Sequence, residues 1–235
     1  MTHPSQFRHR IASGLVWESS TKLGMQVLSW VSMIWVARIL TPDDYGIVAI
    51  SGIYTLLIQI FADYGLTSGL VTRATVGPAQ FRSAFWFNLY AACALYGVLF
   101  VTAPWIAGLY GLPALTDVLR VAGLGVFVNA ARVVPMSLVL RALDYRFRAL
   151  AEMIGQAVQA ISLLLLALNG FREWSLVWSF LIGQGVTTAF FLSRLRGVGA
   201  PTIDLAPIRD ILGFGARMTV HRLVGFGLGM SDMFI

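Results

Sequence analysis

The sequence predicts an all-α integral membrane protein, a polytopic bundle of six transmembrane helices plus the start of a seventh. Hydrophobic residues make up 57% of the 235 residues and charged residues only 12%, whereas a soluble domain carries about a quarter charged residues. The mean hydropathy of +0.76 points the same way. The apolar residues also gather into runs of about 20, the length that crosses a bilayer. This composition excludes a disordered chain and a disulfide scaffold.

Turn residues mark the ends of these apolar runs. The stretch Thr41-Pro42-Asp43-Asp44 predicts a helix start, since threonine can cap a helix, proline suits its first position and acids suit the positive end of its dipole. Later helices are separated at Gly77-Pro78, Gly111-Leu112-Pro113 and Asn169-Gly170. The predicted transmembrane segments are Gly14–Leu40, Pro42–Val71, Ser83–Tyr110, Pro113–Leu143, Phe147–Leu168 and Trp174–Leu195, with a seventh that begins near Ile208 and still runs at Ile235.

Arginine is distributed unequally over the loops that join these segments. Ten arginines lie in the N-terminal tail, the even-numbered loops and the stretch after the sixth segment: Arg8, Arg10, Arg73, Arg82, Arg141, Arg146, Arg148, Arg194, Arg196 and Arg209. The odd-numbered loops hold three, which are Arg38, Arg120 and Arg172. Because basic loops stay in the cytoplasm, the sequence places the N-terminus and the even-numbered loops there.

All the loops are short, which leaves no room for a soluble catalytic domain. We expect a first six-helix transmembrane bundle at residues 1–195, a cytoplasmic linker at 196–207, and the start of a second bundle, a truncated helix seven, at 208–235. The single cysteine, Cys93, allows no internal disulfide and is expected to be buried. The net charge of +6 is attributed to membrane topology and not to a nucleic-acid partner. The sequence lacks metal-ligand, nucleophile and phosphate-loop motifs, so it predicts no enzyme, no cofactor, no metal and no catalytic residue.

Polar side chains inside the apolar segments predict a substrate cavity, because a polar stripe on a membrane helix faces the bundle interior or water. They recur every four residues at Glu18, Lys22 and Gln26 in the first segment, and at Gln59 and Asp63 in the second. Glu18 and Lys22 could instead simply neutralise each other. Cations in a cavity suit an anionic lipid headgroup or pyrophosphate. The seventh segment supplies further candidates for the cavity, which are Arg217, His221, Arg222 and Asp232.

Other polar and small residues favour a structural role. We expect Glu152 to pair with Arg148 one helical turn earlier. Arg132 is expected to lie near the backbone carbonyl that Pro135 leaves without a donor. Close helix contact is the expected role of two glycines in the sixth segment, Gly183 and Gly185.

Four stretches resemble, in order, the motifs of bacterial polysaccharide flippases: Val36–Gly46, Phe61–Leu66, Ala103–Tyr110 and Pro135–Phe147. The first contains Thr41-Pro42-Asp43-Asp44-Tyr45-Gly46, and the second is Phe61-Ala62-Asp63-Tyr64-Gly65-Leu66. The chain is similar to the O-antigen and polysaccharide flippases of the oligosaccharide flippase family, within the multidrug/oligosaccharidyl-lipid/polysaccharide exporter superfamily. The likeness covers about residues 10 to 235.

The resemblance implies a bacterial inner-membrane transporter with two six-helix bundles and alternating access. It implies that an oligosaccharide on a polyprenyl pyrophosphate carrier moves from the cytoplasmic to the periplasmic leaflet, for lipopolysaccharide or exopolysaccharide biosynthesis. The implied partners are the lipid bilayer, this substrate, and the polysaccharide polymerase and glycosyltransferases of the same pathway. Asp232 matches the acid that family members carry in helix seven. Because family members are much longer, we expect this chain to be the N-terminal half only.

Two other interpretations stay open. A cation-coupled multidrug exporter of the same superfamily would share the bundle but favour a drug-sized cavity with few cations. The cations Lys22, Arg217 and Arg222 argue for an anionic substrate instead. A non-transporting membrane scaffold is the second alternative. A membrane enzyme that acts on polyprenyl phosphates would need clustered carboxylates or histidines with metal spacing, which the sequence does not contain.

The arginine distribution makes the topology testable. A reporter fused after Arg148 or Arg196 should be cytoplasmic, and one fused after Gly111 or Arg172 should be periplasmic, because only the basic loops are retained inside. Paired alkaline phosphatase and fluorescent protein fusions measure this. A cytoplasmic signal from the fusion after Arg172 would show that the six-helix arrangement is wrong.

Overall fold

The computed structural model describes residues 24, 26, 30, 32–63, 66–72, 76–195, 201, 202, 204, 206–209, 212 and 213. Residues 32–36 are helical and belong to the end of the predicted first segment. The later elements are α2 (Pro42–Asp63), α3 (Leu66–Thr72), α4 (Pro78–Tyr110), α5 (Ala114–Gly123), α6 (Gly125–Arg141), α7 (Tyr145–Leu168), α8 (Glu173–Leu192) and the 3-10 turn η1 (Ala206–Ile208).

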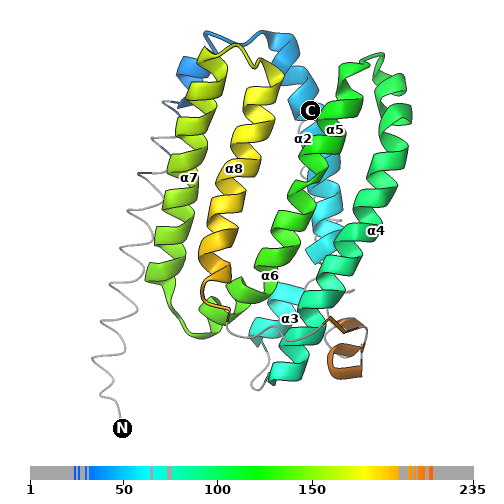
Figure 1. The fold of residues 1–235 in the computed structure, drawn as a ribbon, viewed down its shortest axis with the longest axis vertical. Coiled ribbons are helices and arrows are strands. Elements are labelled where there is room, and N and C mark those ends of the chain that lie inside the picture. The colour runs from blue at the N-terminus through cyan, green and yellow to red at the C-terminus, as the bar shows by residue number, and fades with distance from the viewer. Residues whose placement is uncertain are drawn as a thin grey trace, which may run out of the picture.

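The long helices run up and down past one another (Figure 1). Five stretches are long and apolar enough to cross a membrane: α2, α4, α5 with α6, α7 and α8. The predicted all-α membrane fold is confirmed, and these stretches correspond to the predicted second to sixth segments. Most of the predicted first and seventh segments lies outside the described residues. In Figure 1, α3, η1, the starts of α4 and α7 and the end of α8 share the lower end of the bundle.

The start of α2 is capped as the sequence predicts. The backbone N–H and the hydroxyl of Thr41 both donate to Oδ2 of Asp44, at 2.9 and 2.8 Å. The other carboxylate oxygen, Oδ1, lies 2.9 Å from Nη2 of Arg172, just before α8. The buried carboxylate of Asp44 therefore ties the beginnings of α2 and α8 together. Left-handed glycines follow α4 and α7, at Gly111 (φ +66°) and Gly170 (φ +79°), and a side chain at either position would strain the turn.

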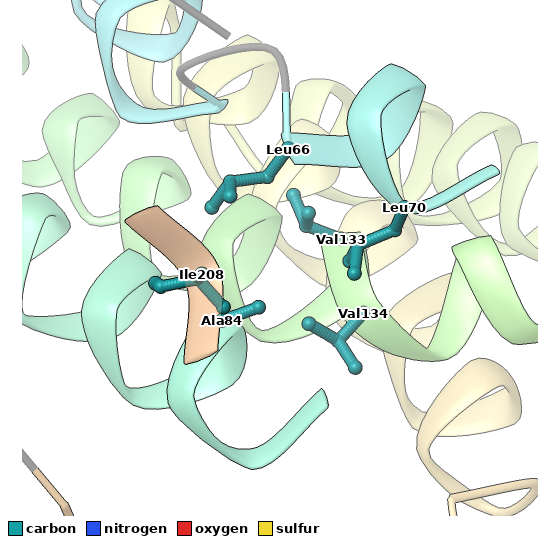
Figure 2. Close-up of a cluster of buried hydrophobic side chains, with 6 residues drawn as sticks. All are labelled: Leu66, Leu70, Ala84, Val133, Val134 and Ile208. Atoms are coloured by element: carbon teal, nitrogen blue, oxygen red, sulfur yellow. The ribbon is translucent and has the colours of Figure 1, made fainter. Parts of the chain in front are cut away.

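The predicted second segment, Pro42–Val71, was too long for one helix, because α2 ends at Asp63 and α3 is a separate short helix. The α3 helix turns its apolar face into the protein instead of towards lipid. Leu66 and Leu70 are fully buried in a cluster with side chains of α4, α6 and η1 (Figure 2). Nη1 of Arg141, at the end of α6, also donates to the carbonyl of Leu70 at 2.8 Å. Tertiary packing thus outweighs the continuous apolar pattern of the sequence.

The predicted fourth segment, Pro113–Leu143, is interrupted at Leu124, between α5 and α6. A side chain at the preceding Gly123 would have its Cβ 2.6 Å from the side-chain end of Leu99 in α4, so the side chain of Leu99 would have to shift to accept it. The expectation that Cys93 is buried was wrong, because this α4 residue is exposed on the helix surface.

The segment after α8 returns to the bundle. Ile208 is fully buried in the cluster of Figure 2, and Nε2 of Gln80 in α4 donates to the carbonyl of Pro207 at 3.2 Å. The first residue of the predicted second bundle is therefore anchored on α3, α4 and α6. The division at residues 196–207 stays a prediction.

Two glycines let α7 and α8 pack at unusually short distance. A Cβ on Gly183 would lie 2.6 Å from Cβ of Gln159 and 2.9 Å from the carbonyl oxygen of Gly155. A Cβ on Gly155 would collide with the hydroxyl of Thr187 and lie 2.9 Å from the carbonyl oxygen of Gly183. The predicted close-contact role is confirmed for Gly183. It has no support for Gly185 in the described part of the chain, where a Cβ at this position would have no atom within 4 Å.

Alanine at either contact glycine should destabilise the bundle. We expect Gly155→Ala and Gly183→Ala to cost about 1–3 kcal/mol, because the backbones must move apart to accept the new methyl group. Thermal melting of the detergent-solubilised chain, followed by size-exclusion chromatography, measures the effect. Gly185→Ala is the matched control in the same helix and should melt like the wild type. Equal melting temperatures for Gly183→Ala and Gly185→Ala would contradict the close-contact role.

Candidate substrate cavity

Three adjoining hollows open between α2, α6, α7 and α8, which pack against one another. Their volumes are about 290, 190 and 370 Å³. Each pair shares a wall residue: Arg132 joins the first two, Gln59 the first and third, and Gln159 the second and third. We call the three together the candidate cavity, and name its parts the Asp63 chamber, the Gln184 chamber and the apolar chamber in that order.

The Asp63 chamber is lined by the end of α2, the start of α3 and the middle of α6. Gln59 and Asp63 lie one helical turn apart on α2 and both line it, so the predicted polar face of this helix does border a cavity. The hydroxyl of Thr67 in α3 donates to Oδ1 of Asp63 at 2.9 Å. The break between α2 and α3 thus places a second polar side chain beside the carboxylate.

Arg132 of α6 lies on the wall between the Asp63 and Gln184 chambers. Its Nη1 donates to Oε1 of Gln184 in α8 at 2.6 Å, and its Nη2 donates to Oδ1 of Asn129 at 3.2 Å. Neither hydrogen bond goes to the carbonyl that Pro135 leaves without a donor, and the expected proximity to that carbonyl stays a prediction. Side-chain amide oxygens one turn earlier in α6 and on the neighbouring α8 accept these hydrogen bonds.

The charge of Arg132 has no carboxylate bound to it among the residues that the structure describes. Glu152 lines the Gln184 chamber, but its Oε1 lies 2.8 Å from Nε of Arg148, as the sequence predicts. Amide oxygens accept hydrogen bonds without cancelling the charge of the guanidinium. Arg132 therefore places a positive charge where the two chambers meet, with Glu152 as its electrostatic neighbour.

The apolar chamber differs in chemistry from the other two. Its two hydroxyl groups are already satisfied within α2: the hydroxyl of Ser51 donates to the carbonyl of Val48, and that of Thr55 to the carbonyl of Ser51, each at 2.8 Å. Most of the remaining wall is aliphatic or aromatic, including Leu176 and Phe180. The candidate cavity is therefore charged and polar at one end and apolar towards the start of α2.

The predicted cavity residues fall into two groups. Gln59 and Asp63 line the cavity, whereas Gln26 is exposed. The others lie outside the described residues: Glu18, Lys22, Arg217, His221, Arg222 and Asp232. Sequence reasoning did not assign Asn129, Arg132 and Gln184 to a cavity. Their signal was present, since each is a polar residue in an otherwise apolar run, but the pairing of α6 with α8 that brings them together is tertiary.

A family comparison decides what kind of protein carries this cavity. Residues 35–235 match the model of a family described as polysaccharide biosynthesis proteins. The chain belongs to this family. This match, together with the relatives named below, confirms the likeness to polysaccharide flippases seen in the four motifs, and the chain is a multi-pass membrane protein.

Several relatives of this family member are known by name. It is 34% identical over 219 residues to the succinoglycan biosynthesis transport protein ExoT of Rhizobium meliloti (strain 1021), covering 93% of this chain and 44% of that protein. It is 22% identical to the lipopolysaccharide biosynthesis protein WzxC of Escherichia coli (strain K12), covering 93% and 45%. It is also 22% identical to the teichuronic acid biosynthesis protein TuaB of Bacillus subtilis (strain 168), covering 92% and 45%.

The chain spans less than half the length of these curated relatives. No solved structure matches it significantly.

Proposed function

We propose that this chain acts in a flippase that moves polyprenyl-pyrophosphate-linked oligosaccharide across the bacterial inner membrane for surface polysaccharide biosynthesis. The observation that carries the proposal is the charged and polar candidate cavity inside an otherwise apolar bundle of a polysaccharide biosynthesis family. ExoT, a relative of this chain, is named as a transport protein.

The proposed substrate is polar over most of its oligosaccharide part. An oligosaccharide cannot enter hydrocarbon without losing its hydrogen bonds to water, and each unsatisfied polar group costs several kcal/mol. A flippase must therefore offer a polar path at membrane depth. Gln59, Gln159 and Gln184 supply amide donors and acceptors on three helices around one space. The apolar chamber beside them suits the hydrocarbon part of a lipid-linked substrate.

The cost of a membrane cation supports the same proposal. Arginine at the centre of a membrane helix costs about 2.5–3.5 kcal/mol on insertion scales. Arg132 lies nine residues from the end of α6, inside the membrane-spanning stretch Ala114–Arg141. A purely structural scaffold would gain stability from an apolar residue there, whereas a carrier of anionic substrate needs the charge.

The remaining parts of the proposal follow the charge pattern and the family. The N-terminus lies in the cytoplasm, and residues 208–235 begin a second bundle that faces the first across the substrate path. Lys22, Arg217, Arg222 and Asp232 are proposed to complete the cavity wall. The polysaccharide polymerase and glycosyltransferases of the pathway are proposed as functional partners.

Deletion of the gene in its host tests the proposed function. We expect surface polysaccharide to be lost and oligosaccharide-linked polyprenyl pyrophosphate to accumulate in the membrane, because synthesis continues while translocation stops. Lipid extraction with mass spectrometry measures the accumulation, and the wild-type gene supplied on a plasmid should reverse it. Normal polysaccharide without accumulation would contradict the proposal. Increased drug sensitivity as the sole effect would favour the multidrug exporter instead.

A further inference from the structure

We infer that Arg132 binds the phosphate-type anion of the substrate, and that Gln184 and Asn129 are positioning residues that hold its guanidinium in place. The inference rests on the proposed function and names a residue for one step of it. The sequence pattern alone points to other cations, namely Lys22, Arg217 and Arg222. The structure assigns this role to Arg132 through its partners and its place in the cavity.

The two partners of Arg132 fix its orientation without neutralising it. A guanidinium has five N–H donors in one plane. Hydrogen bonds from Nη1 to Gln184 and from Nη2 to Asn129 use two of them and set the direction of the plane. The donors that remain can bind an oxyanion bidentately, which is the geometry that makes arginine suited to phosphate.

The neighbouring space can receive such a group. The Asp63 and Gln184 chambers on either side of Arg132 measure about 290 and 190 Å³, several times the roughly 30 Å³ that one water occupies in the liquid. In the described part of the chain, Arg132 alone among the arginines lines these chambers. Both chambers also contain a carboxylate, Asp63 in one and Glu152 in the other, which repels an anion, so Arg132 is the described group of these two walls that attracts one.

The other described arginines with assigned contacts serve the packing of the bundle. Arg148 and Arg172 form ion pairs with Glu152 and Asp44. The guanidinium of Arg120 stacks over the ring of Phe100 at 4.2 Å. Each of these three cations meets an acid or an aromatic face, and Arg141 donates to the carbonyl of Leu70 outside the three chambers. Arg132 instead donates to two neutral amides and lines two chambers, with Glu152 as its electrostatic neighbour. This contrast marks Arg132 as the cation that is available to a ligand.

A competing explanation is that Arg132 only cross-links α6 to α8 through Gln184. Loss of the guanidinium harms the protein under either explanation, so Arg132→Gln alone cannot separate them. Gln184→Glu does separate them, because glutamate has nearly the same shape, can keep the 2.6 Å hydrogen bond and adds a negative charge. A cross-link would be strengthened by this change, whereas an anion site would be neutralised.

Binding to the purified, detergent-solubilised full chain tests the inference. The probes are geranyl pyrophosphate, inorganic pyrophosphate and geraniol, measured by isothermal titration calorimetry with melting temperatures recorded for every variant. Geranyl pyrophosphate contains both the anion and a lipid segment, while each of the other probes contains one of them. We expect Arg132→Gln and Gln184→Glu to weaken binding of geranyl pyrophosphate about tenfold or more, because a charged hydrogen-bonded contact is lost or cancelled.

The control variants distinguish an effect of the lost charge from an effect of a disturbed fold. Arg132→Lys should lose less affinity than Arg132→Gln, because the charge remains but the bidentate geometry does not. Arg120→Gln removes a membrane arginine outside the candidate cavity and should leave pyrophosphate binding unchanged. Any affinity for geraniol should be the same in all variants. Inorganic pyrophosphate shows whether the anion is bound without its lipid, and its binding should follow the same order of variants.

Wild-type affinity for geranyl pyrophosphate in the Gln184→Glu variant would overturn the inference, and so would the absence of measurable binding to the wild type. Failure here is distinguishable from failure of the proposed function. If gene deletion causes lipid-linked oligosaccharide to accumulate while Arg132→Gln binds geranyl pyrophosphate normally, the flippase function is supported and the role of Arg132 is refuted. If pyrophosphate binding depends on Arg132 while gene deletion has no effect on surface polysaccharide, the anion site is supported and the transport function is refuted.

Discussion

A guanidinium inside a membrane bundle must find its hydrogen-bond partners within the protein or in water, and the structure around Arg132 follows from that constraint. Three contacts keep α6 rotated so that Arg132 faces the candidate cavity and not lipid. The buried amide of Asn88 in α4 donates to the carbonyl of Ala130 at 3.1 Å. The hydroxyl of Thr188 in α8 donates to the carbonyl of Val128 at 3.2 Å. Arg141 fastens the end of α6 to α3. Packing of the surrounding helices thus positions one charge.

The residues that let α7 and α8 pack closely also form part of the cavity wall. Gly155 and Gly183 allow the two backbones to approach, and both also line the Gln184 chamber. The approach brings Gln159 of α7 to the same wall as Gln184 of α8. A larger residue at either glycine would move these amides apart as well as loosening the bundle. Stability and the polar lining of the cavity are therefore coupled, which explains small residues in a helix pair that could otherwise pack through leucines.

Local signals in the sequence predict the helices and their ends well. Thr41 and Asp44 form the expected cap, and Gly111 and Gly170 end helices as expected. The candidate cavity was predicted only in part, through the four-residue spacing of Gln59 and Asp63. Spacing along one helix shows which side chains share a face. It does not show which face meets a second helix. The hydrogen bond from Arg132 to a residue 52 positions away could therefore not be predicted from spacing. The separate α3 was missed for the same reason, since its burial depends on α4, α6 and η1.

Cysteine accessibility measures directly whether a water-accessible polar cavity exists inside this apolar bundle. In a Cys93→Ser background, Gln59→Cys should react with a membrane-impermeant methanethiosulfonate reagent applied to membrane vesicles of both orientations, because a thiol reacts as the hydrated thiolate. Val98→Cys is the matched control, since Val98 lies in a membrane-spanning helix, is 61% exposed and lines none of the three chambers. A hydrated cavity predicts rapid reaction at position 59 and slow reaction at position 98. Equal, slow reaction at both positions would contradict it.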